Sequence, residues 1–168
     1  MSMMMMNPRR RRHVVGYALL EALVAVIVTS IGFIGAARLQ TLGLSFTNSS
    51  MNRQKATLLG NQMTDRMRAN QKGMDAGAYN NPTPGSTACL SAAAGCTPAE
   101  LAQADAAEWA ADVAAQLPDG VGLVCLDSTP DDGEDDAPEC DGLGKLFAVK
   151  VWWSDTLGDV RFVTVARP

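Results

Sequence analysis

The stretch that decides the architecture of this chain runs from Gly16 to Ala37 and reads GYALLEALVAVIVTSIGFIGAA. Together with Val14 and Val15 it forms 24 residues in which Glu21 is the only charged side chain. As a helix, this segment extends about 36 Å, which exceeds the thickness of about 30 Å of a bilayer hydrocarbon core. The sequence therefore predicts one membrane-spanning helix close to the N-terminus.

The charges on either side of this apolar segment predict its orientation. Four arginines precede it at positions 9–12, and Arg38 follows it directly. The positive-inside rule then predicts a cytoplasmic N-terminus and places the rest of the chain across the membrane. A conventional secretory signal ends its short apolar core with a small-residue cleavage site. The candidate for such a site, Ser30-Ile31-Gly32, lies inside the apolar segment, so conventional cleavage is the less favoured interpretation.

Glu21 is unusual because a carboxylate at the middle of a bilayer costs about 2.5 to 3.5 kcal/mol on insertion scales. One interpretation is that Glu21, nine residues after Arg12, lies near the interface and snorkels or becomes protonated. A functional interpretation needs a cationic partner inside the membrane. Cleavage after Gly16 would create such a partner, the α-amino group of Tyr17, and the pairing would then be between subunits.

The segment GYALLEALVA at 16–25 resembles the class III signal of type IV prepilins. The resemblance implies that a prepilin peptidase cuts after Gly16 and methylates the new amine of Tyr17. It also implies that Glu21 neutralises the N-terminus of a neighbouring subunit and so aligns it during assembly. The segments SIGFIGAARLQ at 30–40 and VKVWWSD at 149–155 resemble, more narrowly, minor pilins of the PilV family.

The function that this resemblance implies is that of a minor structural subunit of a type IV pilus, taking part in its assembly and priming. The implied partners are the prepilin peptidase, other minor and major pilins, and the inner-membrane assembly platform. The implied location is the inner membrane, crossed once with a periplasmic head, and the pilus after assembly. One alternative is a pseudopilin of a type II secretion system. Another, of a different class, is a membrane-anchored module that binds a ligand or DNA.

Composition supports a structural rather than a catalytic protein. The 168 residues include 14 basic and 18 acidic side chains, and the only histidine, His13, stands in an arginine run. A buried Ser-His or Cys-His catalytic pair is therefore improbable, and we predict no catalytic residue and no cofactor. Removal of residues 1–16 leaves 10 basic and 18 acidic residues, a net charge of −8 that argues against general nucleic-acid binding.

The first helix is expected to continue beyond the membrane to about Asn70, because no proline occurs between Pro8 and Pro82. Glycines weaken a helix, and Gly32 and Gly35 are the most favoured place for bending or local melting. An apolar face with helical spacing is expected to pack on a head domain: Ala56, Leu59, Met63 and Met67. Basic side chains also gather on this helix, and we favour a solvated or subunit-facing surface over DNA binding: Arg53, Lys55, Arg66, Arg68 and Lys72.

The rest of the chain predicts an α+β head, with a small antiparallel sheet packed on the long helix. Residues 73–87 are rich in Gly, Asn, Pro and Ser and are interpreted as a linker. Thr97-Pro98-Ala99-Glu100 predicts a capped helix that runs to about Gln116. Strands are predicted at 121–126, 146–153 and 160–166, with Phe147, Val149, Val151 and Trp153 on one face of the second strand and mixed residues on the other.

The predicted organisation has four parts. Residues 1–16 form the leader, 17–38 the transmembrane and filament-core helix, 39–72 an amphipathic extension of that helix, and 73–168 the head. All four cysteines lie after the membrane span, where an oxidising periplasm permits disulfides. The sequential pairing of Cys89 with Cys96 and of Cys125 with Cys140 is favoured among three connectivities because it encloses two local loops. Zinc is less favoured, since this region has neither a C-x-x-C pair nor a histidine.

Between the last two cysteines the chain is strongly acidic and contains no base. One interpretation is a calcium site, because a hard cation would offset the repulsion between carboxylates. The spacing does not match the EF-hand pattern, so a solvated tip loop is favoured. The candidate calcium ligands are Asp127, Asp131, Asp132, Glu134, Asp135 and Asp136, and Glu139 and Asp141 complete the acidic set.

Overall fold

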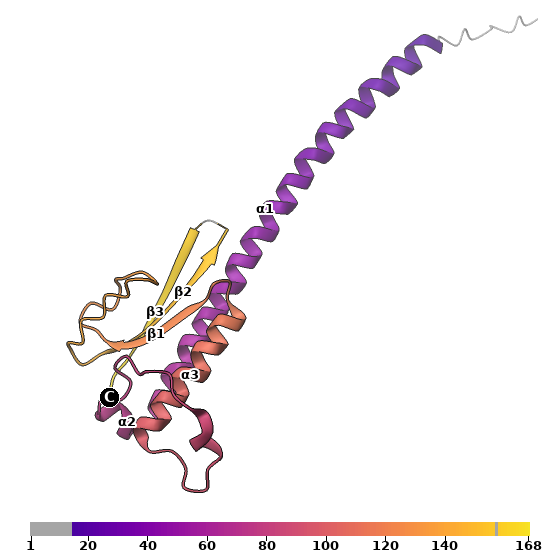
Figure 1. Cartoon of the computed structure of the whole chain (residues 1–168). Helices are drawn as coiled ribbons and strands as arrows, with labels where there is room; N and C mark the ends of the chain where they lie inside the picture. Colours follow the sequence, from indigo (N-terminus) through magenta and orange to yellow (C-terminus); the bar gives the residue numbers. More distant parts are fainter. Residues whose placement is uncertain (1–14, 157) are drawn as a thin grey trace, which may run out of the picture. The chain divides into compact units, whose positions relative to one another are not determined.

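A computed structural model describes residues 15–156 and 158–168. The helices are α1 (Val15–Ala69), α2 (Gln71–Asp75), the short 3-10 helix η1 (Thr87–Ser91) and α3 (Pro98–Gln116). The strands are β1 (Val121–Leu126), β2 (Phe147–Asp155) and β3 (Gly158–Ala166) (Figure 1). The α+β class predicted from the sequence is therefore confirmed. The chain divides into two compact units between Leu44 and Ser45, and we call the second unit, residues 45–168, the head.

Helix α1 is one uninterrupted helix, and its two ends have different surroundings. The predicted local melting at Gly32 and Gly35 is not seen, because the helix is continuous through both residues. From Tyr17 to Leu44 every residue is exposed, whereas four residues of the apolar face predicted further along are fully buried in the head: Ala56, Leu59, Met63 and Met67.

Helix α3 lies antiparallel to the head segment of α1 and contacts it along its length. The Lys55 ammonium donates to the carbonyl oxygen of Gln116 (3.1 Å), and the indole N–H of Trp109 donates to the carbonyl oxygen of Leu59 (2.8 Å). Further on, the amide of Asn70 donates to the carbonyl oxygen of Pro98 (2.8 Å). Two helices with one apolar face each therefore bury those faces together.

The N-terminal end of α3 follows from its sequence. The predicted capping box is present, with the Thr97 hydroxyl accepting from the N–H of Glu100 and the Glu100 carboxylate accepting from the N–H of Thr97. Pro98 occupies the first turn, where its missing N–H has no cost. The apolar side of α3 is buried: Ala102, Ala106, Trp109, Val113 and Leu117.

The three strands form one antiparallel sheet in the order β1-β2-β3. Strand β1 has the predicted bounds, and β2 and β3 begin or end one or two residues away from them. Strand β2 ends two residues later than predicted and β3 begins two residues earlier. Only two residues therefore connect Asp155 to Gly158, where a longer turn was predicted. Gly158 has a φ of +121°, which a side chain would disfavour.

The hydrophobic core lies between the two helices and one face of the sheet. The predicted inner face of β2 contributes Phe147, Val149, Val151 and Trp153, all buried. The interpretation of residues 73–87 as a linker is wrong at its start, because Met74 and Tyr79 are buried members of this core. Glycine, asparagine and proline dominate the composition of residues 73–87. Composition alone therefore does not indicate that Met74 and Tyr79 anchor this segment in the core.

Candidate functional site

The predicted processing and alignment residues lie in the first two turns of α1. Gly16 is within the helix, Tyr17 is 76% exposed, and Glu21 is also exposed. Among the residues that the structure describes, Glu21 takes part in no ion pair. The basic part of the predicted leader, Arg9 to Arg12, lies outside the described residues.

The apolar part of α1 has the dimensions of a membrane span. An 18-residue window of this helix reaches a mean hydropathy of 2.2, and none of that window is buried in the structure. By length and composition, α1 is therefore long and apolar enough to cross a membrane once. A surface of this size needs an apolar environment, supplied either by lipid or by neighbouring protein.

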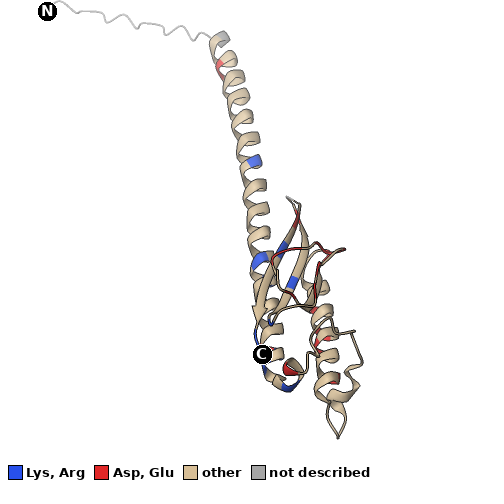
Figure 2. Ribbon diagram, turned by 90° about the vertical axis from the view of Figure 1, so that its left-hand side faces the viewer, with Lys and Arg blue, Asp and Glu red and all other residues tan. Residues whose placement is uncertain are grey.

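In the head, the candidate calcium ligands belong to a loop that we call the acidic strap, residues 127–146. The strap crosses the outer face of the sheet, the face that points away from the core, and its acidic residues lie over the strands (Figure 2). The interpretation of this segment as a solvated tip loop is therefore wrong for part of it: Asp127 is fully buried, and Asp132 is half-buried.

Lys150 of β2 explains why the strap lies on the sheet. Its ammonium donates to the carbonyl oxygens of Asp132 (3.0 Å) and Pro138 (2.9 Å) and to the side chain of Asp132 (3.0 Å). It also lies 2.6 Å from a carboxylate oxygen of Asp127. Burial of the ammonium lowers the pKa of Lys150, but its bonds to the two carboxylates outweigh burial and raise that pKa overall.

Arg161 of β3 holds the strap at a second place. Its guanidinium donates to the carbonyl oxygen of Asp131 (2.8 Å) and to that of Gly133, and it lies 3.3 Å from the Asp131 carboxylate. The sequence between Cys125 and Cys140 contains no base, and the two bases that pair with its carboxylates come from the strands beneath it. Pairing with Lys150 and Arg161 supplies part of the compensation for which a calcium ion was considered.

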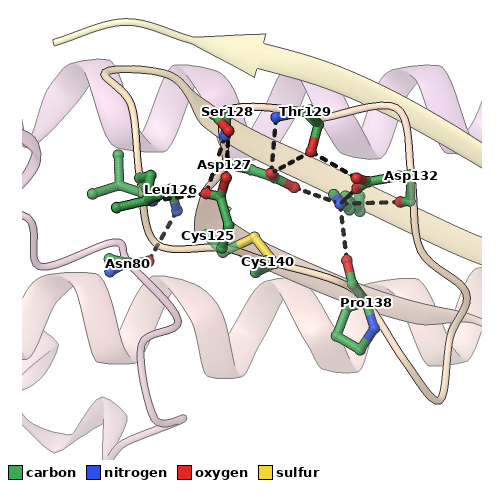
Figure 3. The surroundings of a disulfide bond; sticks show 12 residues. Asn80, Cys125, Leu126, Asp127, Ser128, Thr129, Asp132, Pro138 and Cys140 are labelled. Atoms are coloured by element: carbon green, nitrogen blue, oxygen red, sulfur yellow. Dashed lines mark hydrogen bonds and ion pairs between the residues drawn. A yellow bond between two sulfur atoms is a disulfide. The ribbon is translucent and has the colours of Figure 1, made fainter.

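Two disulfides are present, Cys89–Cys96 and Cys125–Cys140, in the sequential pairing that was favoured. The second one joins β1 to the acidic strap beside Asp127 (Figure 3). The two sulfurs and a carboxylate oxygen of Asp127 lie within 4.8 Å of one another, a spacing that suits a metal ion. Because the sulfurs are bonded to each other, they offer no thiolate to a metal.

Of the other predicted calcium ligands, Asp132 shares the Lys150 ammonium with Asp127. The Asp132 carboxylate accepts from the hydroxyl of Thr129 (2.7 Å) as well as from Lys150. Glu134 and Asp135 instead line a small hollow beside Trp152 and Trp153. The hypothesis of a calcium site stays a prediction, with ammonium and guanidinium groups already placed among its carboxylates.

The basic side chains of α1 have separate roles. Arg66 lies 2.8 Å from Glu108 and 3.5 Å from Asp105 of α3, and its pKa is raised because its bonds to these acids outweigh partial burial, which lowers it. Arg68 pairs with Asp65 on the helix surface. Since Arg66 and Lys55 bind α3, they are not part of an open cationic surface for DNA.

Sequence reasoning missed a buried polar cluster next to Arg66. The Tyr79 hydroxyl donates to the Asp105 carboxylate (2.6 Å) and accepts from the amide of Asn70 (3.2 Å). Burial, and then the bond to Asp105, raise the pKa of Tyr79. This cluster fixes the segment after α2 against α3, and nothing in the spacing of these three residues indicates it.

Comparison with protein-family models, with curated proteins and with solved structures finds no significant match for this chain. A long N-terminal apolar helix followed by a small antiparallel sheet is compatible with a pilin-like fold.

Proposed function

We propose that this chain is a minor structural subunit of a type IV pilus, of the PilV type, with no catalytic activity of its own. The observation that carries the proposal is the order of Gly16, Tyr17 and Glu21 at the start of a helix whose next 23 residues, 22–44, are all exposed. A single carboxylate in so apolar a surface needs a positive partner. The α-amino group that cleavage after Gly16 would create is such a partner.

In this proposal, the leader holds the precursor in the inner membrane until the prepilin peptidase removes residues 1–16 and methylates Tyr17. The apolar helix then leaves the bilayer and packs among the helices of other subunits. Glu21 pairs with an adjacent N-terminal amine and sets the position of the incoming subunit. The head faces outward, contacts other minor pilins and takes part in priming the fibre.

N-terminal mass spectrometry of the mature chain tests the proposal, using protein recovered from membranes and from sheared fibres. We expect a chain that begins at methylated Tyr17, and any other N-terminus would contradict the proposal. Glu21→Ala should abolish incorporation into fibres and leave cleavage intact. Glu139→Ala, which removes an exposed carboxylate from the head, is the matched control and should be incorporated normally.

A pseudopilin of a type II secretion system would share every feature of the N-terminal helix. Deletion of the gene separates the two functions, because loss of surface fibres supports the pilus and loss of exoprotein secretion supports the secretion system. The third possibility, an anchored ligand- or DNA-binding module, predicts instead that the mature chain keeps residues 1–16.

A further inference from the structure

The two edges of the sheet differ in how they are covered. The outer edge of β1 is hydrogen-bonded to the segment after α2: the N–H of Asn81 donates to the carbonyl oxygen of Val124 (2.9 Å), and the side chain of Asn80 accepts from the N–H of Leu126 (2.9 Å). The N–H of Gly142 from the acidic strap also donates to the Leu126 carbonyl oxygen (3.0 Å). These contacts leave little of this edge for another strand.

The outer edge of β3 has no such cover. All nine residues of β3 pair with β2, and within residues 15–156 and 158–168 no other backbone hydrogen bond to β3 is found. The pair Asp155 and Gly158 flanks a two-residue turn and is therefore a hydrogen-bonded pair. Hydrogen-bonded and non-hydrogen-bonded pairs alternate along antiparallel strands, so every second residue of β3 after Gly158 directs its N–H and C=O groups away from β2. The outward-directed residues are Asp159, Arg161, Val163 and Val165.

The side chains of β3 do not protect this edge either. Natural edge strands commonly avoid pairing by carrying a lysine, a proline or an inward charge. The only base in β3 is Arg161, and its guanidinium is bound to the acidic strap at Asp131 and Gly133. Otherwise the strand is rich in β-branched residues, and Val165 is 45% exposed. A long, apolar, unpaired edge of this kind is suited to accept a further strand.

Charges at the two ends of the edge indicate what kind of strand would fit. Asp159 stands at one end and accepts a hydrogen bond from Ser154 (3.0 Å). Arg167 follows the other end, is exposed, and has no ion pair in the described part of the chain. The two lie about 27 Å apart along an extended strand. An added antiparallel segment would match them with an acid at its start, opposite Arg167, and a base at its end, opposite Asp159.

A second copy of this chain would also match these charges. The head segment of α1 runs parallel to β3, since Ser45 lies beside Thr156 and the α-carbon of Gly60 lies against Phe162. A two-fold axis that pairs two β3 strands antiparallel would also make the two α1 segments antiparallel. A second copy is therefore the rival occupant of this edge, and the oligomeric state of the chain tests it.

We propose that the outer edge of β3 is a docking site for an extended segment of a different subunit. That segment adds to the sheet as an antiparallel strand, is apolar in its middle, and carries an acid and a base at its two ends. The inference deepens the proposed function by naming the surface through which the head meets another subunit, and it rests on that function for the source of the strand.

The test measures binding of a fluorescein-labelled nine-residue peptide, EVTVTVTVK, to the full chain in detergent micelles by fluorescence anisotropy. The control peptide KVTVTVTVE has the same composition with its end charges exchanged. We expect saturable binding of the first peptide and about tenfold weaker binding of the second, because two cross-strand ion pairs become two repulsions. Equal affinity for both peptides would overturn the proposed orientation and charge match.

Variants of β3 test the edge itself. Val163→Pro removes an N–H that β2 does not use and should weaken binding at least about tenfold, whereas Val163→Ala keeps the N–H and should bind normally. Arg167→Glu lies beyond the strand, leaves the sheet intact, and should abolish the preference between the two peptides, because each peptide then meets one opposite and one like charge. Binding that neither Val163→Pro nor Arg167→Glu changes would overturn the proposal.

Sedimentation of the full chain addresses the rival occupant. A dimer that Val163→Pro abolishes would assign the edge to a second copy and overturn the proposed partner. The two proposals in this chain also fail separately. A mature chain that begins at Tyr17 but binds neither peptide would refute the docking edge alone, and a chain with another N-terminus that binds EVTVTVTVK would refute the pilus function alone.

Discussion

The ammonium nitrogen of Lys150 lies 2.6 Å from a carboxylate oxygen of Asp127, and neither side chain is exposed to solvent. Lys150 belongs to the central strand of the sheet, and Asp127 is the first residue of the acidic strap. The same ammonium also binds the carbonyl oxygen of Pro138. One buried base therefore fixes two separate parts of the strap to the sheet.

Lys150→Met should lower the free energy of unfolding by about 3 to 5 kcal/mol, because the buried carboxylate of Asp127 loses its compensating charge. Urea unfolding of the full chain in detergent, followed by tryptophan fluorescence, measures this loss. Lys145→Met, which removes an exposed base from the same strap, should change the stability by less than about 0.5 kcal/mol. Equal effects of the two substitutions would mean that Lys150 does not hold the strap.

Replacing both cysteines of the pair Cys125–Cys140 with alanine should lower the free energy of unfolding by about 3 kcal/mol, because the bridge closes a loop of 15 residues. The same change at Cys89–Cys96, which closes a loop of 7 residues, should cost about 2 kcal/mol. The first change should also raise acrylamide quenching of tryptophan fluorescence, since the strap near Trp152 loses its tether. Unchanged quenching would contradict a covering role for the strap.

The two faces of β2 differ in what the alternation of residues along the strand can predict. Alternation along the strand predicted the inner face, because Phe147, Val149 and Val151 all repeat with period two. The other face contains Lys150 and Trp152, and alternation cannot indicate what covers it. Its cover comes from a loop whose acidic composition is typical of solvated segments. The strap was misinterpreted because its neutralising bases are distant in the sequence.

The predicted disulfides and the capped helix α3 needed only local information, and so did the span of α1. Thr97 and Glu100 cap one another within a single turn, and short loops bring Cys89 to Cys96. The cluster of Tyr79 with Asp105, in contrast, joins two side chains that only the packing of the head brings together. The composition of residues 73–87 predicts a linker for that reason.

Gly60→Ala should destabilise the head although alanine favours a helix by about 1 kcal/mol. A Cβ atom at this position would lie 2.8 Å from a ring carbon of Phe162 and 3.2 Å from a methyl of Thr164. Overpacking of this kind costs about 1 to 3 kcal/mol, so the net effect should be a loss. The matched control is Gly43→Ala, where a Cβ meets nothing within 4 Å and the helix should be stabilised. Thermal unfolding followed by circular dichroism measures whether each substitution raises or lowers the thermal midpoint. A higher midpoint for Gly60→Ala would contradict the close approach of α1 to β3.

Acid should loosen the strap at a pH set by its own hydrogen bonds. The hydroxyl of Ser128 and the N–H of Leu143 lower the pKa of Asp141, and the hydroxyl of Thr129 and then Lys150 lower that of Asp132. Because both carboxyls have a lower pKa in the folded chain than in the unfolded one, their stabilisation is present above about pH 4. It is lost as the pH falls below that value through the pKa of each folded group.

The thermal midpoint of the full chain should therefore fall steeply below about pH 4, and Asp141→Asn should make this fall shallower because one of the titrating groups is gone. Circular dichroism at a series of pH values between 7 and 2 measures both slopes. Asp136→Asn is the matched control, since this exposed strap carboxylate makes no hydrogen bond or ion pair within the described residues. It should keep the slope of the unmodified chain. If Asp141→Asn keeps that slope as well, the bonds from Ser128 and Leu143 do not stabilise the fold, and acid acts on the head through other carboxyls.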